Sequence, residues 1–322
     1  MHLQLRALGP VGGLAVGIAL LALAACASGG GESGGAAAPD DAPGSGGAAG
    51  VGGAAGKAGA SGGTIVADAT PSCDVGKLVY LSTIERKLLG FDPKTLAITP
   101  IGDIVCPASS SSVPFGLAID VKGTLWIPYN DGAIYQLTLG DMSCKKSGYK
   151  PLQSGWERFK VAFLGDAASP TGETLYASDL PNDPTKTPSQ GLGRISPDLV
   201  LTPIANYSAP FAHEPATITG RRDGRLFAFF FGSAGRVVAE VDPATAALKA
   251  PIPQPITLSD HNAVAQWGGA YWIFTSVSDG VHSTIDKLVV GKGTKRVVED
   301  AGYTIKGAAV STCAPTAQPD VK

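Results

Sequence analysis

The stretch "SVPFGLAIDVKGTLWIPYNDGAIYQL", from Ser112 to Leu137, contains three short runs of apolar and alternating residues. A Lys-Gly pair separates the first run from the second, and an Asn-Asp-Gly sequence separates the second from the third. Short runs between glycine-containing turn signals are typical of antiparallel strands joined by hairpins. The stretch therefore predicts three consecutive strands, with Trp126 in the middle of the second.

The same pattern recurs along the chain. The positions equivalent to Trp126 are separated by 47, 50, 51 and 45 residues, and they are Val79 in "GKLVYLS", Tyr176 in "ETLYASD", Phe227 in "GRLFAFF" and Trp272 in "AYWIFTS". Apolar first strands precede the complete copies, and third strands end in Asp-Pro or Ser-Pro turns that reverse the chain into a fourth strand. Four short strands in a period of about 45 to 50 residues indicate propeller blades. The sequence predicts an all-β, five-bladed β-propeller over residues 73–315.

The two ends of this region complement each other. The first copy lacks a first strand, because only three residues precede Gly76 after the low-complexity segment. The segment "KGAAVSTC", residues 306–313, aligns Gly307 with Gly116 and has no second strand after it. We therefore expect the C-terminal strand to complete the first blade and close the ring without an exposed sheet edge.

The alignment also predicts how the cysteines pair. Cys73 and Cys313 fall in the turn between the first and second strands of the same blade, which predicts a disulfide that closes a loop of about 240 residues and contributes about 5 kcal/mol. Cys106 and Cys144 remain, and the even count favours a second disulfide between them. The alignment nominally places these two on opposite faces of the ring, so the alternative is that they stay unpaired.

The N-terminus has the pattern of an export signal. His2 and Arg6 precede an apolar run over residues 11–23, which is short for a membrane span and suited to a signal peptide. The run ends in Leu-Ala-Ala-Cys, which resembles a bacterial lipobox. The resemblance implies a signal peptide at residues 1–25 and acylation of Cys26, including a palmitate-type chain. The alternative is an ordinary secretory cleavage beside an unrelated cysteine.

A tether is expected after the lipid anchor. Residues 26–72 are rich in Gly and Ala and contain no aromatic residue, a composition that predicts disorder. We expect the last residues, 316–322, to be disordered too. By the lipoprotein resemblance, Ala27 replaces the aspartate that usually retains such proteins at the inner membrane, which favours the outer membrane, on its periplasmic face or at the cell surface.

Charge excludes one class of partner. The formal net charge is −2 at pH 7, so the chain lacks the basic field that holds a nucleic-acid backbone. The expected partners are the membrane, through the lipid anchor, and an envelope glycan or protein. We expect a monomer that needs no cofactor.

The blade motif also resembles known families. "PFGLAIDVKGTLWI" followed by "GAIYQL" is similar to the blade signature of the six-bladed gluconolactonase and regucalcin group, of NHL-repeat proteins and of virginiamycin B lyase, and to propeller lipoproteins of myxobacteria. The resemblance to the gluconolactonase group implies a central divalent metal held by Glu, Asn and Asp on inner strands. The chain has no such trio in matching positions, and the histidine pattern of the lyase is not evident. The resemblance thus supports the architecture and weakens both enzyme assignments.

Candidate ligand-binding residues lie in the loops that enter the first strands, because propeller ligands bind near the mouth of the central channel. These candidates are Phe115, Trp156, Arg158, His213, Glu214, Asp260 and His261. The two histidines and two carboxylates among them could form a metal or acid–base cluster, or they could hydrogen-bond loop backbones. Trp156 could present its ring to a ligand or pack in the core.

These residues support two functional hypotheses. The first is an outer-membrane lipoprotein whose propeller binds or scaffolds an envelope component, with no catalytic residue and no metal. The second is a metal-dependent hydrolase or lactonase with its site at the channel mouth. We favour the binding protein, because the nucleophile, phosphate-loop and zinc-helix motifs of common enzymes are absent from the sequence.

Overall fold

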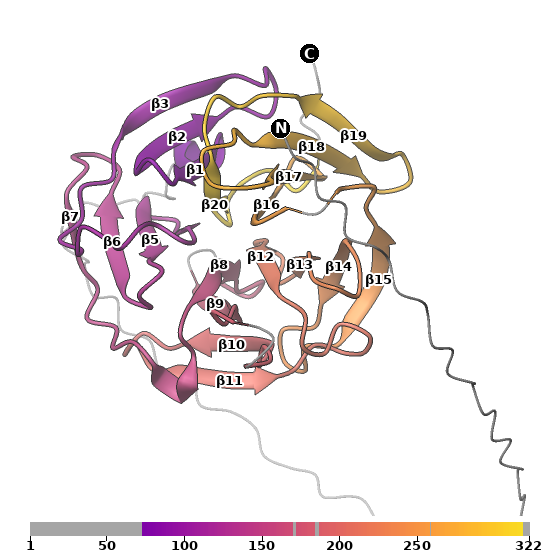
Figure 1. Cartoon of the computed structure of the whole chain (residues 1–322), viewed down its shortest axis with the longest axis horizontal. Coiled ribbons are helices and arrows are strands. Elements are labelled where there is room, and N and C mark those ends of the chain that lie inside the picture. The colour runs from indigo at the N-terminus through magenta and orange to yellow at the C-terminus, as the bar shows by residue number, and fades with distance from the viewer. Residues whose placement is uncertain (1–72, 170–171, 184–186, 258, 318–322) are drawn as a thin grey trace, which may run out of the picture. The chain divides into compact units, whose positions relative to one another are not determined.

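The computed structural model describes residues 73–169, 172–183, 187–257 and 259–317. Over these residues the chain forms five antiparallel sheets of four strands each. The sheets are arranged around a central axis as the blades of a five-bladed β-propeller (Figure 1). The predicted fold class and the predicted number of blades are therefore confirmed.

Each blade runs from an inner strand at the axis to an outer strand at the rim. Blade 1 consists of β20 (Ile305–Ala309), β1 (Val79–Thr83), β2 (Lys87–Phe91) and β3 (Ile98–Asp103). Blade 2 consists of β4 (Ala118–Ile119), β5 (Thr124–Pro128), β6 (Ile134–Thr138) and β7 (Cys144–Lys146). Blade 3 consists of β8 (Phe159–Gly165), β9 (Glu173–Asp179), β10 (Leu192–Ile195) and β11 (Leu201–Ala205). Blade 4 consists of β12 (Ala216–Gly220), β13 (Leu226–Phe230), β14 (Val237–Val241) and β15 (Leu248–Pro253). Blade 5 consists of β16 (His261–Trp267), β17 (Ala270–Ser276), β18 (Thr284–Val289) and β19 (Gly293–Val298). The described helices are two short 3₁₀ turns, η1 (Cys73–Gly76) and η2 (Gln153–Gly155).

The C-terminal strand closes the ring. Strand β20 pairs antiparallel with β1, so that Ser82 lies opposite Gly307. Each inner strand also contacts the inner strands of both neighbouring blades, in the order β20, β4, β8, β12 and β16. The first and last described strands thus share one sheet, as the alignment of the two chain ends predicts (Figure 1).

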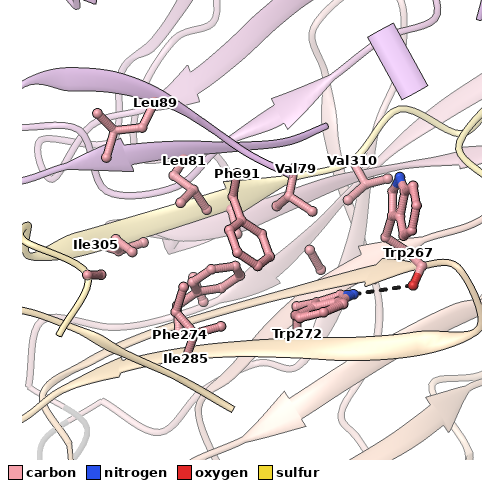
Figure 2. Packing of buried hydrophobic residues seen from close by; sticks show 14 of the residues in the cluster. Val79, Leu81, Leu89, Phe91, Trp267, Trp272, Phe274, Ile285, Ile305 and Val310 are labelled. Atoms are coloured by element: carbon pink, nitrogen blue, oxygen red, sulfur yellow. Dashed lines mark hydrogen bonds between the residues drawn. The ribbon is translucent and has the colours of Figure 1, made fainter. Parts of the chain in front are cut away.

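Side-chain alternation along the strands builds the core between blades. On β1, Val79 and Leu81 belong to the apolar cluster shared with blade 5, whereas Tyr80 belongs to the cluster shared with blade 2. This is the two-residue period of a strand that is buried on both faces. Figure 2 shows the cluster between blades 5 and 1, where Phe91 packs edge-on against Trp272 with 5.1 Å between ring centroids. Each of the five junctions between blades contains one such cluster.

The recurring second-strand position lies on the second strand of every blade. Val79, Phe227 and Trp272 are buried there, and Trp126 and Tyr176 are partly buried against the clusters of their blades. The first strand of blade 2 is shorter than the sequence predicts. The backbone N–H groups of Phe115 and Gly116 both bond to the Pro128 carbonyl, so regular pairing does not begin until Ala118.

One of the two expected disulfides is formed. Cys106 and Cys144 are bonded, with 4.9 Å between their Cα atoms, which confirms their pairing. Their nominal assignment to opposite faces is wrong, because the chain after β3 runs along blade 2. There the Tyr135 hydroxyl donates a hydrogen bond to the Pro107 carbonyl (3.4 Å).

The Cys73–Cys313 disulfide is not formed in the structure, where both residues are free thiols. The alignment nevertheless brings them together, since Cys313 is among the groups that raise the pKa of Cys73. Burial is the largest cause of this rise, which takes the pKa of the Cys73 thiol to about 11. The surrounding chain is closely packed, because a Cβ atom on Gly76 would lie 2.9 Å from the backbone nitrogen of Ala314. A covalent link between the two sulfurs stays a prediction.

Several expectations fall outside the described residues. They are the signal peptide at residues 1–25, the acylated Cys26, the tether at residues 26–72 and the last five residues of the tail. In the part of the chain that the structure describes, no helix has the length and apolar character required to span a membrane.

Candidate functional site

The mouth of the central channel contains a cavity of about 450 Å³. Every blade contributes to its wall: Ile84 from blade 1, Asn130 from blade 2, Arg158 from blade 3, Phe231 from blade 4 and His261 from blade 5. A volume of this size lies within the range of small-molecule sites. We call this space the mouth cavity.

Five of the seven predicted site residues line the mouth cavity, and they are Phe115, Arg158, His213, Asp260 and His261. They come from blades 2, 3, 4 and 5, in each case from the segment that enters the inner strand. The sequence therefore places these residues correctly relative to one another. The two remaining candidates, Trp156 and Glu214, do not line the cavity.

Trp156 is a core residue. Its side chain is fully buried, packs near Phe159 with 6.3 Å between ring centroids, and leaves its indole nitrogen without a partner among the described residues. Gly193 makes room for it, since a Cβ atom on that residue would lie 3.0 Å from the indole ring. The prediction that Trp156 faces a ligand is wrong, and the alternative of core packing is correct.

Of the two interpretations of the two histidines and two carboxylates, the cluster is not assembled. The Glu214 carboxylate accepts hydrogen bonds from Ser233 Oγ (2.6 Å) and the Ala234 backbone (2.9 Å). His213 Nδ1 instead bonds with the Ser189 carbonyl (3.0 Å). In the described part of the chain, no group of three or more His, Cys, Asp or Glu side chains is arranged to hold a metal ion. The metal interpretation of these four residues is therefore wrong for this geometry.

His261 belongs to a different cluster, with Asp279 and Lys306. Its Nε2 atom lies 2.6 Å from Asp279 Oδ1, and Lys306 Nζ lies 2.9 Å from His261 Nδ1 and 2.9 Å from Asp279 Oδ1. Burial and the charge of Lys306 lower the pKa of His261, although Asp279 acts in the opposite direction. Lys306 Nζ also lies 3.1 Å from Nε2, so the ammonium group faces both ring nitrogens, and its charge favours a neutral imidazole.

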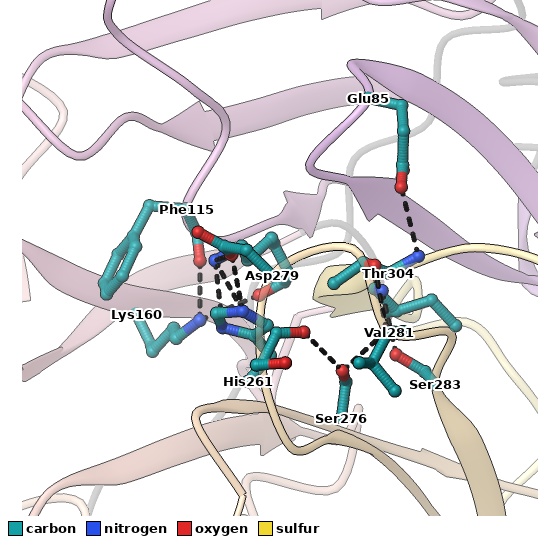
Figure 3. A network of polar contacts seen from close by, with 12 residues as sticks. Glu85, Phe115, Lys160, His261, Ser276, Asp279, Val281, Ser283 and Thr304 are labelled. Carbon is teal, nitrogen blue, oxygen red and sulfur yellow. Dashed lines mark hydrogen bonds and ion pairs between the residues drawn. The ribbon is translucent and has the colours of Figure 1, made fainter. Parts of the chain in front are cut away.

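Lys160, on β8, is buried beneath this cluster. Its Nζ atom donates to the carbonyl oxygens of Phe115 (2.6 Å) and Lys306 (2.8 Å). Burial, followed by the charges of Lys306 and Arg158, lowers the pKa of Lys160 well below its usual value. Figure 3 shows Lys160, Phe115, His261 and Asp279 converging from three different blades.

The Phe115 ring lies between cationic groups. Lys160 Nζ is 4.3 Å from its centroid, and the Arg158 guanidinium carbon is 4.7 Å from it, both within the range of cation–π attraction. Arg158 is fixed by bonds from Nε to the Leu180 carbonyl (3.1 Å) and from Nη2 to the Pro181 carbonyl (3.3 Å). Burial lowers the pKa of Arg158.

Sequence reasoning did not identify Lys160, Lys306 and Asp279. Both lysines open apolar inner strands, in "KVAFLG" and "KGAAV", and a lysine there is a signal that could have been used. Charged side chains are rarely buried without a partner or a function. Asp279 lies in a glycine-containing turn after β17 that has no distinguishing pattern.

A second cavity, of about 650 Å³, lies between blades 2 and 3 and is lined partly by Trp126, Phe163 and Glu173. It is larger than the mouth cavity, but it is lined by two blades alone, and two of its polar side chains are already bonded. The Glu173 carboxylate accepts from the Val121 backbone (2.9 Å), and Trp126 donates to Asp120 (3.4 Å). We therefore regard the mouth cavity, which gathers side chains from every blade, as the better candidate site.

Comparison with known proteins finds only distant structural similarity. No protein-family model matches the chain, and no curated protein matches it significantly. Among solved structures, YjhT is 13% identical over 62% of this chain and 69% of its own, with a TM-score of 0.42. Hydrazine synthase of Kuenenia stuttgartiensis is 13% identical over 70% of this chain and 67% of its own, with a TM-score of 0.40. A Bacteroides caccae protein of unknown function is 12% identical over 69% of this chain and 72% of its own, with a TM-score of 0.39. At this level of similarity none of them indicates a ligand or an activity.

Proposed function

We propose that this protein is an exported, lipid-anchored β-propeller that binds a small component of the bacterial cell envelope in the mouth cavity. The observation that carries the proposal is that side chains from all five blades converge on this cavity. Convergent polar groups in a partly apolar cavity are typical of ligand sites. The lipobox-like sequence that ends at Cys26 supports export and anchoring at the outer membrane.

The geometry favours binding over metal-dependent hydrolysis. His213 and Glu214 make separate contacts with backbone and hydroxyl groups, and His261 lies between Lys306 and Asp279. A metal-dependent hydrolase would need histidine nitrogen atoms and carboxylate oxygen atoms gathered around one metal ion. The described residues offer no such arrangement.

The binding proposal is tested with the full-length chain on a glycan array that includes envelope polysaccharide fragments. Ile84→Trp places a large ring at the rim of the mouth cavity, and Val200→Trp adds the same ring at an exposed residue outside its wall. We expect the array signal to be lost in Ile84→Trp and kept in Val200→Trp. A signal that survives Ile84→Trp would contradict the mouth cavity as the binding site.

The anchoring proposal has its own test. Expression of the full-length chain with radiolabelled palmitate in a Gram-negative host should label the native protein and not the Cys26→Ser variant. The labelled protein should sediment with outer membranes, whereas Cys26→Ser should remain soluble after export. Cys73→Ser serves as the control, and label retained in Cys26→Ser would show that Cys26 is not the acylated residue.

A further inference from the structure

Trp126 differs from the other tryptophans in its exposure. Trp156, Trp267 and Trp272 are at most 2% exposed. Trp126 is partly exposed and lines the second cavity, of about 650 Å³, between blades 2 and 3. We call this space the junction cavity. Of the four tryptophans in the chain, Trp126 is therefore the one whose ring a ligand can reach.

At two other blade junctions the corresponding ring is covered by the next blade. Tyr271 of blade 5 packs edge-on against Phe227 of blade 4, with 5.1 Å between ring centroids. Phe91 of blade 1 packs in the same way against Trp272 of blade 5, again with 5.1 Å between centroids. Phe227 and Trp272 are 2% and 0% exposed as a result.

Blade 3 has aliphatic side chains at both of these covering positions. Tyr271 directly precedes the recurring position of β17, and Leu175 directly precedes that of β9. Phe91 ends the third strand of blade 1, and Ile195 ends the third strand of blade 3. Leu175 and Ile195 lie opposite each other across β9 and β10, and both line the junction cavity. Their smaller side chains account for the open volume beside Trp126.

The Trp126 ring is held in position by its own neighbours. Its Nε1 atom donates to Asp120 Oδ2 (3.4 Å), and Phe163 makes an edge contact with 5.9 Å between ring centroids. Asp120 is fixed in turn, because its Oδ1 atom accepts from the backbone N–H groups of Lys122 (2.9 Å) and Thr124 (2.8 Å). A ring that is already ordered loses little conformational freedom when a ligand stacks on it.

The charged residues of the junction cavity balance one another. Asp120 and Glu173 are acidic, Lys122 and Arg194 are basic, and the four charges sum to zero. Glu173 already accepts two hydrogen bonds. Lys122 is exposed, and its ammonium group has no partner among the described residues, so it can donate to a ligand. A wall without net charge favours a neutral ligand over an anion or a cation.

We propose that the junction cavity binds a neutral saccharide, with the apolar face of one sugar ring on Trp126 and its hydroxyl groups at Asp120 Oδ2 and Lys122. A pyranose ring has a C–H face and a rim of hydroxyl groups, which match an aromatic surface bordered by an acceptor and a donor. The junction cavity shares no lining residue with the mouth cavity. This site is therefore additional to the one in the proposed function.

The fluorescence of Trp126 tests the proposal on the full-length chain. Acrylamide quenches exposed tryptophans, and the other three are buried, so quenching reports Trp126. The probes are four neutral disaccharides, cellobiose, maltose, lactose and chitobiose, with cellobiouronate as the charged counterpart of cellobiose. We expect at least one neutral disaccharide to reduce the quenching saturably, with a Kd of about 1 mM for one stacked ring and a few hydrogen bonds. Cellobiouronate should not bind more tightly than cellobiose.

Variants locate the sugar. Leu175→Tyr and Ile195→Phe each restore an aromatic ring at a covering position, so both should reduce the quenching of Trp126 in the free protein. By calorimetric titration, both should weaken disaccharide binding about tenfold or more, as should Trp126→Ala. Ile84→Trp, which alters the mouth cavity, is the matched control and should bind the disaccharide as the native protein does. Near-UV circular dichroism checks that each variant keeps the native packing, and the quenching of the native protein requires no variant.

The outcomes separate this inference from the proposed function. It is overturned if none of the four neutral disaccharides protects Trp126, if cellobiouronate binds more tightly than cellobiose, or if folded Leu175→Tyr and Ile195→Phe bind as the native protein does. Disaccharide binding that is lost in Ile84→Trp and kept in Trp126→Ala also overturns it, and instead supports the mouth cavity. A Kd of about 1 mM is too weak to be retained on a washed glycan array. An array signal that is lost in Ile84→Trp thus upholds the proposed function whatever Trp126 binds.

Discussion

Ser82 lies directly opposite Gly307 across the pairing of β1 and β20, near the two ends of the described chain. The approach is close, since a Cβ atom on Gly307 would lie 2.7 Å from Ser82 Oγ and 2.8 Å from the backbone carbon of Gly116. Ring closure therefore depends on a residue without a side chain at the point where blades 1 and 2 meet.

Gly307→Ala should destabilise the protein. Overpacking of a closely packed site costs about 1–3 kcal/mol, and this backbone cannot move away without disturbing β4. Gly140→Ala is the matched control, because nothing lies within 4 Å of a Cβ atom there. Urea unfolding should show a lower midpoint for Gly307→Ala and little change for Gly140→Ala. Equal midpoints for the two variants would show that closure tolerates a side chain at this position.

Cys73 and Cys313 should form a disulfide when the protein is oxidised. The two thiols interact closely enough for Cys313 to raise the pKa of Cys73, and linking them would close a loop of about 240 residues and add about 5 kcal/mol in the chain-entropy treatment. Peptide mapping without reductant should recover the Cys73–Cys313 peptide, and Cys73→Ser should remove the added stability. Oxidised protein in which both thiols remain free would refute the link.

The rate of that oxidation should depend on pH. The thiolate is the reactive form of cysteine, and the pKa of the Cys73 thiol is raised to about 11. Cys73 is therefore almost wholly protonated at neutral pH, and its thiolate fraction rises about tenfold for each pH unit below the pKa. Alkylation of Cys73 by iodoacetamide, followed at its own peptide at pH 7, 8 and 9, reports this thiolate directly and should accelerate accordingly.

The blades could be predicted from the sequence because their signals are local. The residue at the second-strand position, such as Val79 or Trp272, recurs with a nearly constant period, and the glycine at 307 matches the one at 116. The site could be predicted in part, since the loops before the inner strands do meet at the mouth. The contacts of Lys160 could not be predicted, because its hydrogen-bond partner Lys306 is 146 residues away in the sequence. The two residues meet only when the ring is closed.

Core packing of Trp156 was the favoured interpretation of the sequence, although its loop position left exposure open. The space for its indole ring comes from Gly193 on β10, a residue on another strand of the same blade. The sequence around Trp156 does not show which residue provides that space.

Trp156 should contribute to stability and not to ligand binding. Trp156→Ala leaves a large cavity in the core between blades 2 and 3, and truncations of this kind cost about 3–5 kcal/mol. Trp156→Phe should cost much less, because it keeps most of the apolar surface and removes an indole N–H that has no partner among the described residues. Thermal unfolding measures both variants, and the glycan-array signal of Trp156→Phe should match that of the native protein. Weakened binding in Trp156→Phe would return this residue to the site.

Asp179 should make the protein less stable at neutral pH than in mild acid. Burial is the largest cause that raises its pKa from 3.8 to about 6, and its Oδ1 atom has no hydrogen-bond partner among the described residues. Between these two pH values the folded protein binds more protons than the unfolded chain, so stability falls as pH rises. The favourable contribution of the protonated carboxyl is fully present below pH 3.8 and is lost as pH rises through about 6.

Asp179→Asn isolates this contribution. The amide cannot ionise, and its oxygen can still accept the hydrogen bond that the Gln190 backbone donates to Asp179 Oδ2 (2.8 Å). Relative to the native protein, the variant should gain about 3 kcal/mol at pH 8 and little at pH 4. Denaturant unfolding across this range measures the difference, and Asp198→Asn, at an exposed turn, controls for the loss of one negative charge. A stability difference between native protein and Asp179→Asn that stays constant from pH 4 to pH 8 would show that Asp179 is ionised throughout, with its burial compensated by contacts other than the one from Gln190.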